Sequence, residues 1–306
     1  MSGLSTSSST LSTTSASDAT RGLLLGLAGV AMFALSIPMT RLAGGSDAAP
    51  QLDPAFVAFG RAAVAGLLSV AYLLLTGARS PRGREWGLLA FTAAGVVFGW
   101  PLLLGWAVRH VDAVHAAVIS GVLPLATAAI AALWLRQRPS LGFWACALAG
   151  LVLVLGFAWW RGAGGLQGAD LLLLGAVLAA SSGYVSGARL AGELSPEQVI
   201  SWVLVLSLPV TVPVAALSWP QAPVAAAAWG GFLYVSLFSM WLGFFAWYHG
   251  LALGGVLRVS QVQLLQPFLA IGAAALLLGE ALKPATVGFA LAVLVVVGLG
   301  RRTRIA

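Results

Sequence analysis

The fold follows from two stretches of the sequence that align with each other: AVRHVDAVHAAVISGVLP at residues 107–124 and GLALGGVLRVSQVQLLQP at residues 250–267. They lie 143 residues apart, and each ends on a proline inside a long apolar segment. A second pair supports the alignment, because RLAG closes an apolar segment at residues 41–44 and again at residues 189–192, 148 residues later. Self-similarity at about half the chain length indicates two copies of one structural unit.

The composition places most of this chain in lipid. Hydrophobic residues make up 60% of the 306 residues and charged residues only 8%. A soluble protein of this length could not cover its surface with so few polar groups. Apolar runs of about 20 residues predict membrane-spanning helices, because backbone groups in hydrocarbon must bond within their own segment. The single cysteine, Cys146, excludes an internal disulfide.

We predict an all-α integral membrane protein with ten transmembrane helices in two inverted five-helix repeats. Residues 1–21 are rich in serine and threonine and are expected to form a disordered cytoplasmic tail. The first repeat covers residues 22–160, the second covers residues 169–300, and residues 301–306 form a basic cytoplasmic tail. The spans are expected at residues 22–43, 54–76, 86–108, 112–135, 140–160, 169–190, 197–217, 228–250, 255–279 and 284–300.

The positive charges set the orientation of these spans. Eleven arginines fall at the N-terminus, in the even-numbered loops and at the C-terminus, against four positive residues in the other loops. The excess places both termini in the cytoplasm. Five spans is an odd number, so the second repeat must be inverted relative to the first, which creates an interface at the bilayer midplane. The use of 15 arginines with one lysine favours a bacterial source, hence the cytoplasmic (inner) membrane.

The repeated motifs resemble a known family. They are WAVRHVDA at residues 106–113 with LP at 123–124, GLAL at 250–253 with QP at 266–267 and LGE at 278–280, and Arg61 after PAF at 54–56. This pattern looks like the paired EamA domains of the drug/metabolite transporter superfamily over about residues 22–300. The resemblance implies a central cavity and export of small metabolites such as amino acids. The first repeat departs from it at Arg136-Gln137, where the second has Gly279-Glu280.

Polar residues form a row on one face of the ninth expected span, at Ser260, Gln263 and Gln266. This spacing keeps them on one helix face. A polar face toward lipid would be costly, so the row must look inward. Pro267 also frees the backbone carbonyl of Gln263. The row either lines a substrate cavity or joins the repeats by hydrogen bonds, and we favour the cavity.

Two other spans repeat this combination of proline and polar side chains, and a third adds a deep tyrosine. The fourth carries His115 and Ser120 before its own proline, and the first carries Ser36 and Pro38. Ser36 aligns with Tyr184 of the sixth span at the spacing of 148. A tyrosine hydroxyl at depth needs a hydrogen-bonding partner, so these residues are further cavity candidates.

Large aromatic and very small side chains add two expectations. Trp100 and Trp241 lie deeper in their spans than the other tryptophans, and their rings either wall a cavity or face lipid. GxxxG pairs predict close helix contact in the third, sixth and eighth spans. These pairs are Gly95/Gly99, Gly183/Gly187 and Gly250/Gly254.

The charged candidates are few. Arg61 is expected inside the second span, about 10 Å from its start, where a charge is costly unless it is paired. It bonds either a substrate carboxylate or structural groups such as backbone carbonyls and Asp53, and we favour the structural bond. No carboxylate is expected near the midplane, which leaves His115 and His249 as candidates for coupling to protons. If each only makes a hydrogen bond near a helix end, exchange without ion coupling is the alternative.

We therefore expect a secondary transporter that exports amino acids or related small metabolites by alternating access. The alternatives are a transporter of another solute class, such as a sugar or a cationic drug, a membrane enzyme and a non-transporting scaffold. Three histidines, one cysteine and no buried carboxylate give no converging catalytic set, so we expect no catalytic residue, no metal and no cofactor. The expected partners are a small-molecule solute, membrane lipid and, as candidate coupling ion, protons, with no nucleic acid and a monomer or homodimer.

The orientation can be tested with a reporter fused after Ala306. When it is fused at this position, a reporter that works only in the cytoplasm should be active, because the excess of positive charge retains both termini inside. Activity confined to a reporter that works only outside the cytoplasm would reverse the orientation.

Overall fold

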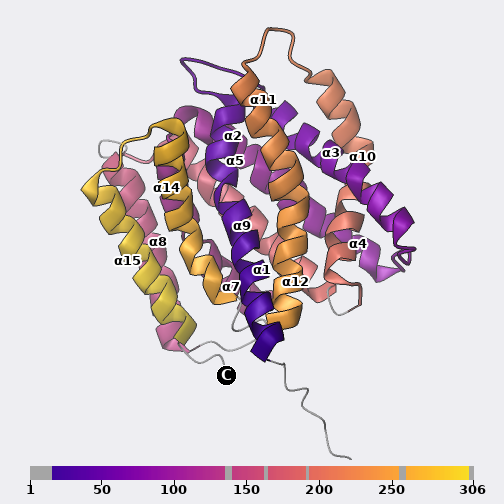
Figure 1. The fold of residues 1–306 in the computed structure, drawn as a ribbon. Helices are drawn as coiled ribbons and strands as arrows, with labels where there is room; N and C mark the ends of the chain where they lie inside the picture. Colours follow the sequence, from indigo (N-terminus) through magenta and orange to yellow (C-terminus); the bar gives the residue numbers. More distant parts are fainter. Residues whose placement is uncertain (1–15, 135–139, 162–164, 191–192, 255–259, 303–306) are drawn as a thin grey trace, which may run out of the picture.

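The computed structural model describes residues 16–134, 140–161, 165–190, 193–254 and 260–302. Their secondary structure is helical, which confirms the predicted fold class, and the spans follow one another in the predicted order (Figure 1). In chain order the helices are α1 (Ala16–Ala34), α2 (Ser36–Gly44), α3 (Pro54–Leu75), α4 (Arg84–Thr92), η1 (Ala93–Gly99), α5 (Trp100–His110), α6 (Ala113–Ser120), α7 (Leu123–Trp134), α8 (Leu141–Arg161), α9 (Gly168–Leu190), α10 (Pro196–Leu217), α11 (Ala226–Tyr234), η2 (Val235–Leu242), α12 (Gly243–Gly254), η3 (Ser260–Leu265), α14 (Gln266–Leu278) and α15 (Pro284–Arg302).

Eight helical segments of the described chain are long and apolar enough to cross a membrane, and the apolar helices Gln266–Leu278 and Pro284–Leu299 are shorter. The described part of the ninth span begins at Ser260, since residues 255–259 of the expected span lie outside the described residues. Most of the expected tail at residues 1–21 and Arg136-Gln137 also lie outside them, as do residues 303–306.

The two halves pack as inverted counterparts. The third span runs from α4 at the bottom of Figure 1 to α5 near the top, whereas the eighth runs from α11 at the top to α12 at the bottom. α1 packs along α12, just as its counterpart α9 packs along α5. The remaining spans pack against their own counterparts, α3 on α10, α8 on α15, and α6 on α14.

Prolines break the helices of three spans at the positions that the sequence indicates. Proline lacks an N–H group and clashes with the carbonyl four residues before it, so the α-helix is interrupted on its N-terminal side. Pro38 follows the break between α1 and α2 at Leu35, and Pro124 follows the break between α6 and α7. Pro267 lies where the 3₁₀ helix η3 changes into α14.

The third and eighth spans contain a different irregularity, a π-helical segment in the middle of each. These segments are η1 and η2, and they occupy corresponding places in the two repeats. π-Helical turns are rare and are frequent at functional sites, because they widen the helix and redirect its side chains. Pro101 lies two residues after the end of η1, whereas no proline lies within η2 or in the two residues after it.

The predicted contact of small residues is confirmed between the third and sixth spans. A Cβ atom added to Gly95 would lie 2.3 Å from the backbone oxygen of Ala179, and one on Gly183 would lie 3.2 Å from the backbone oxygen of Thr92. The backbone of α9 therefore lies directly against the end of α4 and against η1, and the contact at Gly95 leaves no room for a larger residue.

The outer surface suits a lipid environment. The exposed leucines include Leu74, Leu75 and Leu276, which are between 78% and 87% exposed in the absence of lipid. Trp159 and Trp219 are each 56% exposed near the ends of their spans, where tryptophan commonly anchors a protein at the membrane interface.

Gly95→Ala should lower the free energy of unfolding by about 1–3 kcal/mol, because the added methyl group overpacks a backbone contact. The control is Gly156→Ala in α8, where an added Cβ meets nothing within 4 Å. Thermal unfolding in detergent measures both variants. A Gly95→Ala protein as stable as the control would show that η1 and α9 do not touch.

Candidate functional site

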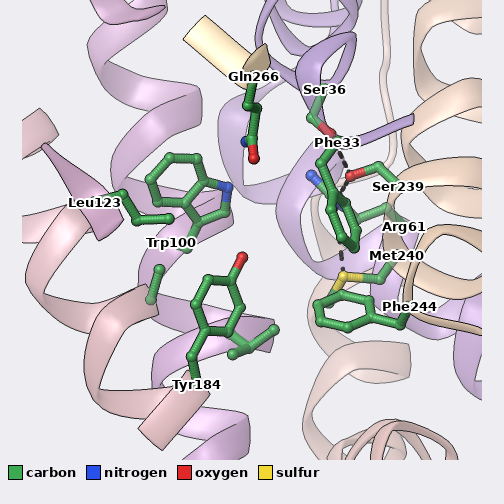
Figure 2. Close-up of a pocket in the computed structure, with 12 residues that line it drawn as sticks. Phe33, Ser36, Arg61, Trp100, Leu123, Tyr184, Ser239, Met240, Phe244 and Gln266 are labelled. Carbon is green, nitrogen blue, oxygen red and sulfur yellow. Dashed lines mark hydrogen bonds between the residues drawn. The ribbon is translucent and has the colours of Figure 1, made fainter. Parts of the chain in front are cut away.

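A cavity lies between the two repeats, bordered by the broken helices and the π-helical segments. It is small, with about 30 Å³ of room for a water-sized molecule. It is lined by Phe33, Ser36, Arg61, Val96, Trp100, Leu123, Ala180, Tyr184, Ser239, Met240, Phe244 and Gln266. Figure 2 shows the ring nitrogen of Trp100, the hydroxyl of Tyr184 and the side-chain amide of Gln266 pointing into this space.

Several lining residues are counterparts in the two repeats. Ser36 of α2 and Tyr184 of α9 correspond at the spacing of 148 residues. Val96 of η1 corresponds to Ser239 of η2 at the spacing of 143. Leu123 and Gln266, each directly before a proline, correspond at the same spacing. The cavity therefore lies where the two inverted halves meet, which is the place expected for a substrate site in such a fold.

Arg61 is the only charged side chain among the described residues that line this cavity. It projects from the second turn of α3 and is 2% exposed. Its Nη2 donates to Ser239 Oγ at 2.8 Å and to Met240 Sδ at 3.6 Å, and Ser36 Oγ donates to Ser239 Oγ at 2.5 Å (Figure 2). The guanidinium group of Arg61 is thus bonded directly to two residues of the eighth span and, through Ser239, to Ser36 of the first span. These contacts join the two repeats.

The structure does not provide the expected bond between Arg61 and Asp53. Asp53 lies at the start of α3, where its Oδ1 accepts a hydrogen bond from the backbone N–H of Ala55 at 2.8 Å. The Nε and Nη1 atoms of Arg61 are buried and have no hydrogen-bond partner among the described residues. The pairing is wrong because Asp53 stabilises the N-terminus of its own helix, which is an ordinary role for a residue at that position.

A second, mostly apolar cavity, with about 20 Å³ of room for a water-sized molecule, adjoins the first and shares Leu123 and Gln266 with it. Ser120, Gln263 and Pro267 line this cavity. The polar row of the ninth span and its counterpart in the fourth therefore face each other across the repeat interface. The side chain of Ser260 lies outside the described residues.

The remaining predicted residues do not line either cavity. Pro38 is buried in α2, two residues after Ser36. Trp241 packs on Phe245 with ring centroids 5.0 Å apart. His249 lies near the C-terminal end of the eighth span, far from the cavity residues in the middle of that span. Its side chain is 59% exposed and pairs with Glu197 in the first turn of α10.

His115 forms a buried pair that the sequence did not reveal. Its Nε2 donates to Asp170 Oδ1 at 2.7 Å, and these side chains are 4% and 1% exposed. Asp170 Oδ2 also accepts from the backbone N–H of Gln167 at 2.8 Å. The expectation that the chain buries no carboxylate is therefore wrong, because Asp170 reaches inward from the first turn of α9 to a histidine on another span.

Glu280 joins the repeats at the face where α6 begins. Its two carboxylate oxygens accept hydrogen bonds from the backbone N–H groups of Ala113 and Val114 at 2.9 and 2.8 Å. Carboxylates stabilise the N-terminal end of a helix in this way. Gly279 makes the approach feasible, since its φ of 66° lies in the left-handed region, which glycine adopts without strain.

The opposite face is held by Arg79 in the loop before α4. It donates to the carboxylate of Glu85 at 2.9 and 2.7 Å and to the backbone oxygen of Glu193 at 2.7 Å. The hydrogen bond to Glu85 raises the pKa of Arg79 above its ordinary value. Both faces of the bundle therefore carry polar contacts between segments that are distant in the sequence.

Sequence reasoning found Ser36, Trp100, Tyr184, Gln266 and Arg61 as residues that the structure brings together. It missed Ser239, Met240 and the apolar part of the lining. Ser236 and Ser239 share one face of the eighth span, which was an available signal. The first repeat has no polar residue at the position of Ser239, so comparison of the repeats could not add to it.

The described part of the chain thus has eight long apolar helices and two shorter ones, arranged as two inverted repeats around a central cavity, and this architecture defines a multi-pass membrane transporter. The chain belongs to the EamA-like transporter family, whose sequence profile matches residues 20–161 and 167–300, one match for each repeat. The family resemblance read from the motifs is thereby confirmed.

Two relatives are similar over most of their length. "Uncharacterized transporter YdeK" of Bacillus subtilis (strain 168) is 41% identical over 285 residues, which cover 92% of this chain and 98% of that protein. "Probable terminal-alkyne amino-acid exporter" of Streptantibioticus cattleyicolor is 29% identical over 234 residues, covering 74% and 77%. A solved crystal structure superposes with a TM-score of 0.62 at 17% identity, covering 91% of this chain and 97% of that chain, and this likeness concerns the fold alone.

Ser239→Ala should lower the free energy of unfolding by about 1.5–3 kcal/mol, because it removes an oxygen acceptor from a buried charged group. Ser236→Ala is the matched control, since its hydroxyl bonds only the carbonyl of Phe232 in its own helix. Thermal unfolding in detergent should show the larger loss for Ser239→Ala. Equal losses would mean that the bond to Arg61 contributes nothing specific.

Proposed function

We propose that this protein is a secondary transporter that moves amino acids or related small metabolites out of the cell by alternating access. The observation that carries the proposal is the cavity at the repeat interface, lined by counterpart residues of two inverted halves. In such a fold, rocking of one half against the other exposes a central site to each side of the membrane in turn.

The shape of the cavity supports alternating access. The cavity is narrow, so a solute as large as an amino acid enters only if the lining helices move apart. The helices offer places for that movement, because three spans are broken at prolines and two contain π-helical segments beside the cavity. Breaks of this kind let half of a helix tilt while the rest stays packed.

The solute class and the direction are inferred from one relative and from the cavity lining. The Streptantibioticus relative is described as a probable amino-acid exporter, and its 29% identity covers three quarters of each chain. Both relatives are bacterial, which supports a location in the bacterial cytoplasmic membrane. The proposed cytoplasmic position of both termini rests on the distribution of the arginines. A sugar or a cationic drug is the alternative solute, although the described cavity lining contains no carboxylate to attract a cation.

Protons are the candidate coupling ion in this proposal. The buried pair of His115 and Asp170 joins the fourth and sixth spans, and both spans contribute residues to the cavity. Histidine changes charge near neutral pH, and a change of charge in a buried pair alters the balance between two packings. His249 pairs with Glu197 and is exposed, so it is the less suitable candidate.

The direct test is uptake into liposomes that contain the purified protein. A panel of labelled amino acids, sugars and amines is offered with and without an imposed pH gradient. Amino acids should accumulate above the level in empty liposomes, and a pH gradient should change the rate if protons are coupled. Uptake of none of these solutes contradicts the proposed function, and uptake of amino acids unaffected by pH contradicts proton coupling.

Gln263→Leu should reduce amino-acid uptake to the background of empty liposomes without impairing insertion or folding. The substitution keeps the size of the side chain but removes an amide that faces the repeat interface. The control is Gln221→Leu, an exposed position in a loop, which should transport normally. Normal transport by Gln263→Leu would exclude a polar contact there.

A further inference from the structure

We propose that Arg61 binds the carboxylate of the transported solute, so that the cavity accepts carboxylic acids and rejects amines that lack a carboxylate. The inference rests on the proposed transport function and deepens it, because it names the chemical group that the site requires. It also reverses the structural role that the sequence favoured for Arg61.

Arg61 is a buried charge without a buried counter-charge. An arginine guanidinium stays protonated in proteins, and a charge within the membrane is normally paired or coordinated. The partners of Arg61, however, are the neutral hydroxyl of Ser239 and the thioether of Met240. None of the described residues that line the cavity is an aspartate or a glutamate. An anionic solute would supply the missing negative charge.

The guanidinium is held in place and still has donors to offer. Ser239 binds Nη2 and is itself bound by Ser36, so the orientation of the group is fixed from two other spans. The N–H groups on Nε and Nη1 are buried without a partner among the described residues, although each could donate a hydrogen bond. Guanidinium donors of this kind match the oxygens of a carboxylate in geometry and charge.

The other lining residues match the remainder of such a solute in chemistry. Phe33, Trp100, Tyr184 and Phe244 give it a largely aromatic wall, and the Gln266 amide and the Tyr184 hydroxyl point into the space (Figure 2). Amide and hydroxyl oxygens and ring faces can receive an ammonium group. They do not compensate the repulsion between Arg61 and a solute whose only charge is positive. The site therefore requires a carboxylate, tolerates an amine and favours an apolar side chain.

Arg61 also makes the two sides of the cavity chemically different, so a bound solute has one preferred orientation. Pro54 of α3 and Pro196 of α10 begin corresponding helices, and the residue that corresponds to Arg61 is Val203, which is buried and apolar. The positive group is therefore present on one side of the repeat interface only. A carboxylate binds toward α3 and η2, and the other end of the solute lies toward Trp100, Tyr184 and Gln266.

The test compares three probes that differ only in their charged groups: 3-phenylpropionate, phenylalanine and phenethylamine. Binding to the full-length protein in lipid nanodiscs is measured by calorimetry and by the shift in the thermal unfolding midpoint. The two carboxylates should bind at least about tenfold more tightly than the amine, the difference expected when a bond to a charged group is lost. Equal or tighter binding of phenethylamine would overturn the proposal without any variant.

Variants then separate binding from a structural role. Arg61→Gln should remove the preference for carboxylates, Arg61→Lys should keep the preference with weaker binding, and the control Arg189→Gln should behave as wild type. Arg189 is a suitable control because it lies over the ring of Trp134, 5.4 Å from its centroid, and lines neither cavity described above. If Arg61 were only structural, its variants would be less stable but would still prefer carboxylates.

Binding and transport can fail separately. Carboxylate binding that depends on Arg61, in a protein that moves no solute into liposomes, would support this site and contradict the proposed transport. Uptake of amino acids that is equal in wild type and Arg61→Gln would support transport and overturn this site. The absence of both binding and uptake would overturn both.

Discussion

Hydrocarbon offers no hydrogen bonds, so a membrane helix can be irregular only where other protein groups surround the irregularity. In this protein the proline breaks of α1/α2, α6/α7 and η3/α14, together with η1 and η2, all border the interface between the repeats. The same constraint keeps the outer helices regular. The cavity, its polar groups and the places where helices can bend therefore occur together for one physical reason.

Duplication explains the shape of the site, and divergence explains its chemistry. The counterpart pairs Ser36/Tyr184 and Leu123/Gln266 place a lining residue at the same depth from each repeat. In the sequence, the two strongest polar features have no charged counterpart of the same kind, since Val203 takes the place of Arg61 and Gln137 takes the place of Glu280. An inverted duplication alone would give a symmetric cavity, whereas a single buried cation makes the two halves chemically different.

Much of the site could be predicted because depth in the membrane follows from position along a span. A polar residue in the middle of an apolar segment is expected to face protein, which identified Ser36, Gln266 and Tyr184. The bond between Arg61 and Ser239 joins residues 178 positions apart, and the pair of His115 and Asp170 joins different spans. No periodicity within a span specifies which side chain of another span it meets.

The sequence by itself determined the order of the apolar spans, their inversion and the helix breaks near Pro38, Pro124 and Pro267. These properties depend on local composition, on proline and on the requirement that backbone groups be satisfied within each segment. Only the tertiary structure decided that Arg61 faces neutral partners instead of Asp53, and that Glu280 stabilises the start of α6. Those outcomes depend on how helices rotate and approach one another, which is set by side-chain packing across the whole bundle.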